Sequence, residues 1–254
     1  MTDHGWTRSV LSHPSGRGPV SLNGNGHDGR RGSVLAVGAH PDDIELGCAG
    51  ALLAHRARGE EVSMLVMSGG ELGPQDERSR LAEQQAAAEI LGAGLYWGNF
   101  RDSAVPDGCE AVDVIQDVMA AVRPDVVYTH SADDTHQDHR ATAAATFAAA
   151  RRANRIVCYE APSSLGFAPS FFVDIADFLE MKLEALRAHT SQVLKNGLVD
   201  LEAIEAQARY RGFQARIRLA EAFVVERFLW ELNRPAITVA PELSAHEELM
   251  ALGR

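Results

Sequence analysis

Short apolar runs alternate with segments of helical spacing along most of the chain, beginning at Ser33. Apolar and β-branched runs predict buried strands at 33–39, 61–67, 95–97, 125–130 and 155–159. Between them, apolar residues at helical spacing predict helices at about 47–58, 78–91, 110–122 and 141–150. This alternation predicts an α/β, Rossmann-like fold, in which a mostly parallel sheet is flanked by helices.

The last third of the chain has a different pattern. Its spacing predicts a strand, two helices and a final strand, at 171–174, 176–189, 201–222 and 223–230. We expect these elements to form a smaller C-terminal helix/strand extension of the same domain.

The two ends of the chain differ in composition from the middle. Residues 1–31 are crowded with Gly, Ser, Asn, Pro and Arg and have too few apolar side chains to offset the entropy of folding, so we expect a disordered leader. Residues 236–254 carry few packing signals, and we expect a C-terminal tail. A single domain is therefore expected over 32–235.

Net charge narrows the classes of partner. The chain has 24 Lys and Arg against 35 Asp and Glu, so its formal net charge is −11. Such a surface repels phosphate backbones and anionic membranes, which argues against nucleic acid and membrane insertion. Without an apolar secretory or membrane-spanning stretch we expect a cytoplasmic protein, with its 3 cysteines as reduced thiols.

Two polar segments follow predicted strands. His40-Pro-Asp-Asp43 comes directly after the first strand, and Asp134-Thr-His-Gln-Asp-His139 comes after the strand that ends at His130. Because ligands bind beyond the carboxyl ends of parallel strands, we expect the two segments to meet there. Imidazole and carboxylate together suit zinc and similar divalent metals.

Each segment has a simpler interpretation when taken alone. The first is compatible with a turn that caps a helix, and the second with a solvated polar cap. Both explanations weaken when the two segments follow strands of one α/β sheet. Two other histidines stay open: His130 is a spare ligand that is more often structural, and His189 is more typical of helix capping or packing.

These motifs resemble those of the PIG-L/LmbE-like de-N-acetylases, a zinc-dependent family that includes N-acetylglucosaminyl deacetylases. The resemblance rests on residues 39–47, which read AHPDDIELG and match the family's AHPDDxExG pattern, and on the DxHxDH pattern of 134–139. Weaker matches extend it from about 33 to 226. Ala49 departs from the family's usual Gly, at a position that affects helix packing rather than chemistry.

The resemblance implies a role for each matching residue. His40, Asp43 and His139 would bind the metal, with Zn²⁺ favoured over other first-row metals. Asp42 would be the general base, His136 would face the developing oxyanion, and Asp138 would orient a neighbouring imidazole. Positions that the family places near the substrate are Glu71, Arg80 and Asp102.

The activity implied is metal-dependent hydrolysis of the N-acetyl amide of an N-acetylglucosamine-type conjugate, a small-molecule amino-sugar substrate. Composition is compatible with specialised-metabolite (antibiotic) biosynthesis, and a homo-oligomer is left open. The nearest alternative is an amidase of the same family that acts on a larger acyl group or a thiol-conjugate glycoside.

Two alternatives come from other classes of protein. A non-catalytic metal-binding module is disfavoured because it has no need of Asp42 beside Asp43. A nucleotide-binding oxidoreductase is disfavoured because no GxGxxG follows the first strand.

Overall fold

The computed structural model describes residues 32–73, 77–195 and 199–230. The expected leader and tail, and the stretch 231–235 at the end of the expected domain, lie outside the described residues. Within the described part of the chain, every helix is too short or too polar to cross a bilayer. The three thiols are free: Cys48 and Cys158 are buried, and Cys109 is exposed.

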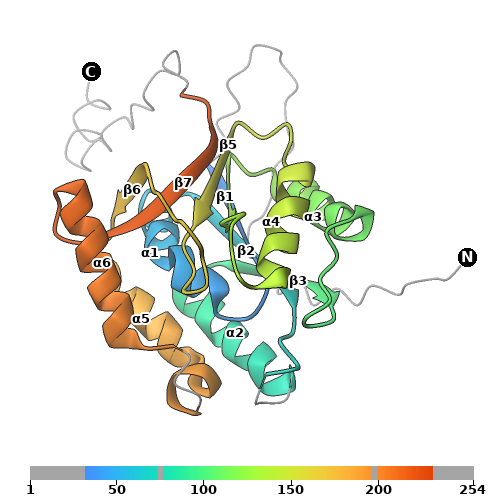
Figure 1. Cartoon of the computed structure of the whole chain (residues 1–254), viewed down its shortest axis with the longest axis horizontal. Coiled ribbons are helices and arrows are strands. Elements are labelled where there is room, and N and C mark those ends of the chain that lie inside the picture. The colour runs from blue at the N-terminus through green and yellow to red at the C-terminus, as the bar shows by residue number, and fades with distance from the viewer. Residues whose placement is uncertain (1–31, 74–76, 196–198, 231–254) are drawn as a thin grey trace, which may run out of the picture.

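One seven-stranded sheet forms the centre of the molecule (Figure 1), in the order β3-β2-β1-β4-β5-β7-β6. Its strands are β1 (Ser33–Gly38), β2 (Glu61–Ser68), β3 (Gly94–Phe100), β4 (Val126–His130), β5 (Arg155–Tyr159), β6 (Phe171–Asp174) and β7 (Ala220–Phe228). The first five pair in parallel, whereas β7 pairs antiparallel with both β5 and β6. The predicted mostly parallel α/β sheet is confirmed.

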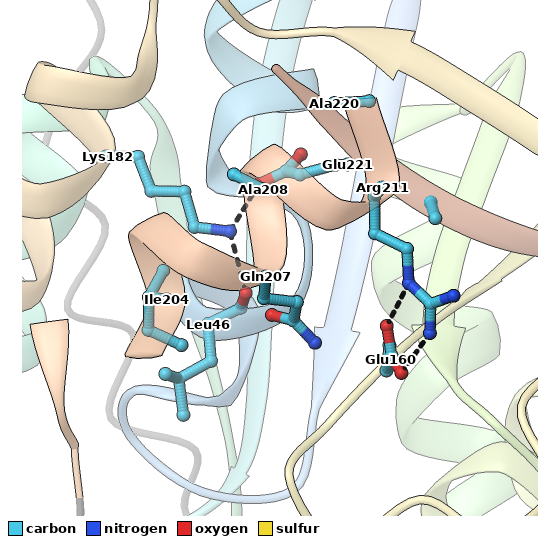
Figure 2. Close-up of a pocket in the computed structure, with 11 residues that line it drawn as sticks. Leu46, Glu160, Lys182, Ile204, Gln207, Ala208, Arg211, Ala220 and Glu221 are labelled. Carbon is cyan, nitrogen blue, oxygen red and sulfur yellow. Dashed lines mark hydrogen bonds and ion pairs between the residues drawn. The ribbon is translucent and has the colours of Figure 1, made fainter. Parts of the chain in front are cut away.

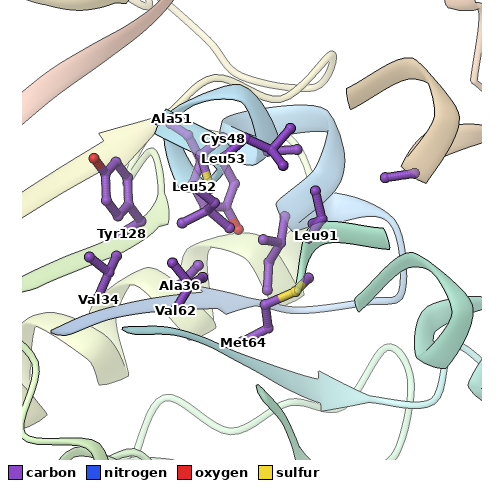
Figure 3. Close-up of a cluster of buried hydrophobic side chains, with 14 of the residues drawn as sticks. Val34, Ala36, Cys48, Ala51, Leu52, Leu53, Val62, Met64, Leu91 and Tyr128 are labelled. Atoms are coloured by element: carbon purple, nitrogen blue, oxygen red, sulfur yellow. The ribbon is translucent and has the colours of Figure 1, made fainter. Parts of the chain in front are cut away.

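Helices cover both faces of this sheet. They are α1 (Asp43–Ala57), α2 (Glu77–Leu91), α3 (Cys109–Val122), α4 (Gln137–Ala149), α5 (Leu179–Ala188) and α6 (Leu201–Ala215). Val34 and Ala36 of β1 pack in the cluster that α1 and α2 cover (Figure 3), whereas Leu35 and Val37 pack toward α3 and α4. Because successive strand residues point to opposite faces, the interior of a strand buried on both faces must be apolar, as β1 is from Val34 to Val37.

The C-terminal extension is fastened to α1 by a buried ion pair. Lys182 of α5 donates to Glu221 of β7 at 2.6 Å and to the carbonyl of Leu46 at 2.8 Å (Figure 2). Glu221 also accepts the backbone N–H groups of Gly50 and Ala51 in α1. The two buried charges are therefore hydrogen-bonded as well as paired, which offsets much of the cost of removing them from water.

One glycine lets α1 approach the sheet closely. A Cβ placed on Gly47 would lie 2.1 Å from a ring carbon of Tyr159 in β5, so only glycine fits there. This contact gives a physical reason for the glycine that ends the first motif.

Several predicted boundaries were wrong. α1 and α4 begin four residues earlier than expected, at Asp43 and Gln137, so the metal motifs run into the helices. The helix expected over 201–222 ends at Ala215, and β7 already begins at Ala220. Arg216 ends that helix in a left-handed conformation with φ 60°, which the apolar spacing of the sequence did not signal. A short π-helix, Ser191–Lys195, was also missed.

Candidate metal centre

The two polar motifs meet at the carboxyl edge of the sheet. β1 and β4 are adjacent and parallel, so the segment after Gly38 and the segment after His130 emerge side by side. The first motif turns at Pro41 and Asp42 into α1, and the second ends in the first turn of α4. This is the convergence that the sequence predicted.

Asp43 lies at the centre of a cluster of imidazoles. Its Oδ1 is 3.3 Å from His139 Nε2, and its Oδ2 is 3.4 Å from His40 Nδ1. The same Oδ2 accepts the backbone N–H of His40 at 2.7 Å and lies 3.2 Å from His130 Nε2. We call His40, Asp43, His130 and His139 the metal-side cluster; all four side chains are buried.

Two carboxylates orient the two outer rings. Asp138 Oδ2 lies 3.1 Å from His40 Nε2, and Asp134 Oδ2 lies 3.2 Å from His139 Nδ1. Because each carboxylate accepts from one nitrogen, the hydrogen-bond network assigns the proton to that nitrogen and leaves a lone pair on the other. Those other nitrogens, His40 Nδ1 and His139 Nε2, are the ones that face Asp43.

Asp138 thus lies beside the His40 ring, and its orienting role stays a prediction. Asp134 was missed as a functional residue, although it opens the second motif; its distance along the chain from His139 gives no sign that the two side chains touch.

His130 is a weaker ligand candidate than its position suggests. Its Nε2 accepts the backbone N–H of Ala39 at 3.1 Å, so the lone pair nearest Asp43 is already engaged. Burial lowers the pKa of His130 to about 4, which keeps the ring neutral. Its ring stacks on that of His139 with centroids 4.0 Å apart, so it packs against that imidazole.

The charges around the cluster suit a cation. Burial opposes protonation of His40, but Asp102, Asp138 and Asp43 outweigh it and raise its pKa to about 12. Burial likewise opposes protonation of His139, but Asp43 and Asp134 outweigh it and raise its pKa to about 9. The site therefore favours positive charge, and its imidazole and carboxylate donors are those that zinc prefers. The residues present fit a divalent metal.

Donor atoms gather in more than one combination here. His40, His136 and His139 offer ligand atoms within 4.8 Å of one another, and so do Asp43, His130 and His139. A third group is His40, Asp102 and Asp138. The predicted set His40, Asp43 and His139 is not itself one of these groups, although Asp43 lies within 3.4 Å of both imidazoles, and it stays our prediction.

Asp42 faces a different environment from its neighbour Asp43. Its φ is 96°, which is a left-handed backbone conformation. For a residue other than glycine this conformation costs on the order of 1–3 kcal/mol, and residues strained in this way are found mostly at functional sites. Asp42 Oδ2 lies 3.6 Å from Arg80 Nη2. Burial, and then the charge of Asp43, raise the pKa of Asp42 to about 7.

His136 caps the N-terminus of α4 with its ring. Its Nδ1 accepts the backbone N–H of Asp138 at 3.2 Å, so the proton of the neutral ring belongs on Nε2. The side chain is half-buried, and its ring lies 4.7 Å from that of His40. A fixed N–H beside the cluster is what an oxyanion donor requires.

The three residues expected near the substrate are held by protein contacts. Arg80 donates to the carbonyls of Pro41 and Gly70 and is only 6% exposed. Glu71 accepts the backbone N–H of Asp102, while Asp102 accepts that of Leu72 and lies 3.2 Å from His40 Nε2. All three therefore shape the site, and their contact with substrate stays a prediction.

A surface groove adjoins the cluster on the α4 side. It has a volume of about 550 Å³ and includes Asp138 in its lining. The rest of the lining comes from Ala132 after β4, from the loop before α3 and from α4, including Val105, Pro106, Ala144 and Phe147. It is of the size that holds small organic ligands.

Comparison with known proteins places the chain in a family. The PIG-L family, described as GlcNAc-PI de-N-acetylase, matches residues 35–150, which contain both motifs. An uncharacterized deacetylase of Escherichia coli K12, YaiS, is 36% identical over 171 residues, which are 64% of this chain and 92% of the relative. The chain belongs to the PIG-L family.

A second relative of this PIG-L chain has a named substrate. The diacetylchitobiose deacetylase of Thermococcus kodakarensis is 31% identical over 185 residues, which are 63% of this chain and 69% of the relative. Among solved structures, a conserved protein of Thermus thermophilus has a TM-score of 0.71 and 29% identity, covering 79% of this chain and 97% of that one.

The same fold also occurs in an enzyme of another class. GalB, the 4-carboxy-2-hydroxymuconate hydratase of Pseudomonas putida KT2440, has a TM-score of 0.70 at 24% identity and covers 79% of this chain and 99% of that one. That likeness is one of fold alone. The reaction of a PIG-L chain must therefore be argued from its own site.

Proposed function

We propose that this PIG-L protein is a metal-dependent N-deacetylase that hydrolyses the acetamido group of an N-acetylglucosamine-type amino sugar to acetate and a free amine. The observation that carries the proposal is the Asp42–Asp43 pair. Asp43 points into the imidazoles of the metal-side cluster, and Asp42 stands outside them with a raised pKa. One carboxylate is thus available to bind a metal and the other to move a proton.

The metal would be held by His40, Asp43 and His139, with Zn²⁺ the first candidate. When bound, it supplies a Lewis acid that polarises the amide carbonyl and lowers the pKa of water. Asp138 and Asp134 hold the two imidazoles in the tautomers that turn a lone pair inward.

The remaining steps fall to this chain's own side chains. Asp42 takes a proton from the attacking water and returns a proton to the amine nitrogen as the C–N bond breaks. His136 donates its Nε2–H to the oxyanion of the tetrahedral intermediate. The products are acetate and the protonated amine, so atoms and charge balance with one water consumed.

The substrate class is supported by the deacetylase relatives and by the size of the site. The 550 Å³ groove beside Asp138 offers room for the part of a conjugate beyond the acetamido sugar. We extend the proposal to small amino-sugar conjugates, including intermediates of specialised metabolism, and place the reaction in the cytoplasm.

The test is a screen for acetate release. The purified protein is incubated with N-acetylglucosamine, diacetylchitobiose and N-acetylglucosaminyl conjugates, after treatment with a chelator and after addition of Zn²⁺. Acetate should appear only in the metal-loaded samples. Release of a longer acid from matched N-acyl substrates, with little acetate, would favour the larger-acyl amidase instead. Absence of any amine product from the whole series would refute the deacetylase assignment.

A further inference from the structure

Both ends of one peptide group beside the candidate base are held by the same helix. The carbonyl of Pro41 accepts from Arg80 Nη2 at 2.6 Å, and the N–H of Asp42 donates to Gln84 Oε1 at 3.2 Å. These are the two polar atoms of the Pro41–Asp42 peptide. Arg80 and Gln84 are four residues apart on α2, so they project from one face of that helix.

Gln84 is itself held in one orientation. Its Nε2 donates to Glu45 Oε1 at 2.6 Å, and because the amide nitrogen is committed there, the amide oxygen must face Asp42. His189 Nε2 lies 3.5 Å from the same Glu45 oxygen. The side chains of Glu45, Gln84 and His189 are all 0% exposed, so none of them reaches a substrate directly.

This arrangement matters because Asp42 has a left-handed backbone conformation that a residue with a side chain rarely adopts. A residue with φ 96° and a Cβ persists only where its surroundings fix it. The two hydrogen bonds to α2 set the plane of the peptide that precedes Asp42. They therefore restrict its φ and, with it, the direction of its carboxylate.

We propose that Gln84, anchored by Glu45 and His189, is a positioning residue that acts with Arg80 to clamp the Pro41–Asp42 peptide and aim the Asp42 carboxylate. The α2-side cluster, meaning Glu45, Arg80, Gln84 and His189, is then part of the catalytic apparatus, and its fully buried members Glu45, Gln84 and His189 act without touching substrate. The inference rests on the proposed function, in which Asp42 is the general base.

The segment that carries His189 is fastened to the same helix. Glu83 of α2 accepts from Ser191 Oγ at 2.6 Å and from Thr190 Oγ1 at 2.7 Å, and α2 packs against α5 along its length. The C-terminal extension therefore buttresses the clamp through α2. None of the four residues of the metal-side cluster comes from this extension.

The central variant is Gln84→Met, which keeps the length of the side chain and removes both hydrogen bonds. We expect kcat to fall by about 10- to 100-fold, the scale of a slightly misplaced catalytic group, while KM and metal content stay near the wild-type values. Gln85→Met is the matched control: Gln85 is the next residue of α2, and its side chain donates to Glu89 of its own helix. It should keep wild-type kcat.

A second variant guards against simple loss of folding. In Gln84→Glu/Glu45→Gln the acid and the amide exchange places, so the new carboxylate accepts both from the Asp42 N–H and from the new amide. The melting temperature and metal content of each variant are measured first. Among folded variants, the exchange variant should turn over faster than Gln84→Met. Wild-type kcat in Gln84→Met, or an exchange variant no faster than it, would overturn the clamp.

Hydrogen exchange tests the clamp independently of activity. In Gln84→Met, the Asp42 amide should exchange faster than in the wild type, whereas amides of β5 should be unchanged. An unchanged Asp42 amide would count against the proposal even if kcat fell. If the wild-type protein deacetylates nothing, the proposed function fails, but this exchange measurement still decides whether Gln84 holds the peptide.

Discussion

The metal-side cluster and the α2-side cluster meet at two adjacent aspartates and treat them in opposite ways. Burial alone would raise the pKa of Asp43, but the charge of His139 above all outweighs it and holds the pKa well below its usual range. On the other side, burial and the charge of Asp43 raise the pKa of Asp42 to about 7. One carboxylate is therefore kept as an anion among donors for a metal, and the other is suited to exchange a proton.

The backbone explains how neighbours come to differ so much. Asp43 is the first residue of α1, and its side chain turns back to the N–H of His40. Asp42 precedes the helix in a left-handed conformation, so its side chain points away from that of Asp43 and toward Arg80. Two identical side chains thus acquire two environments because one bend in the chain separates them.

The largest effect should come from removing the metal-side carboxylate. Asp43→Asn replaces an anionic ligand with a neutral amide, so metal content should fall and turnover should drop to near background. Excess metal in the assay should restore part of the activity, because affinity rather than chemistry is lost. Elemental analysis and acetate release measure the two effects. A full equivalent of metal in this variant would show that Asp43 is not a ligand.

Asp42→Asn should separate the two sides most clearly. The change keeps the size of the side chain and removes the proton acceptor, so turnover should fall by about two to four orders of magnitude. Metal content should stay near normal, and added metal should restore nothing. The reverse pattern, with Asp42→Asn losing metal and Asp43→Asn losing only turnover, would exchange the two assignments.

His136→Phe tests whether that imidazole donates to an oxyanion or binds the metal. Loss of one oxyanion donor should lower kcat by about 100- to 1,000-fold with metal still bound. Because His136 also offers a donor atom near His40 and His139, the alternative is loss of metal. Metal analysis of the same sample distinguishes the two roles, and a metal-free variant would make His136 a ligand.

The smallest effect should come from Asp134, which orients His139 rather than binding the metal. Asp134→Asn should weaken metal affinity by about 10- to 100-fold, measured by competition with a chelator. Asp133→Asn is the matched control: Asp133 is the adjacent residue and its side chain is exposed. Equal affinities for the two variants would remove Asp134 from the site.

Much of the fold could be predicted because its signals are local. The apolar run of β1 and the helical spacing of α2 gave nearly correct elements, since a strand buried on both faces and an amphipathic helix leave their periods in the sequence. The helix starts at Asp43 and Gln137 were placed too late. Polar residues in a first turn look like loop when apolar spacing is the only guide.

Within the candidate site, the sequence predicted the residues that belong to the two motifs. His40, Asp43 and His139 stood out because each follows a strand that ends at the same edge of the sheet. Gln84 did not stand out, and Asp134 was given no role of its own although it opens the second motif, because a glutamine in a helix and an aspartate in a turn are common in any protein. Only the contacts Gln84–Asp42 and Asp134–His139 give these residues a role.

The sequence by itself therefore determined the α/β architecture, the chemistry of the donors and the edge where they gather. Those properties follow from periodicity and residue type, which a linear pattern carries. Tertiary structure alone decided which nitrogen of each histidine faces Asp43, why Asp42 differs from Asp43, and which helix holds the Pro41–Asp42 peptide. These depend on contacts between residues far apart in the chain, such as His40 with Asp138 and Glu45 with His189, which fix tautomer, charge and direction only when the chain is folded.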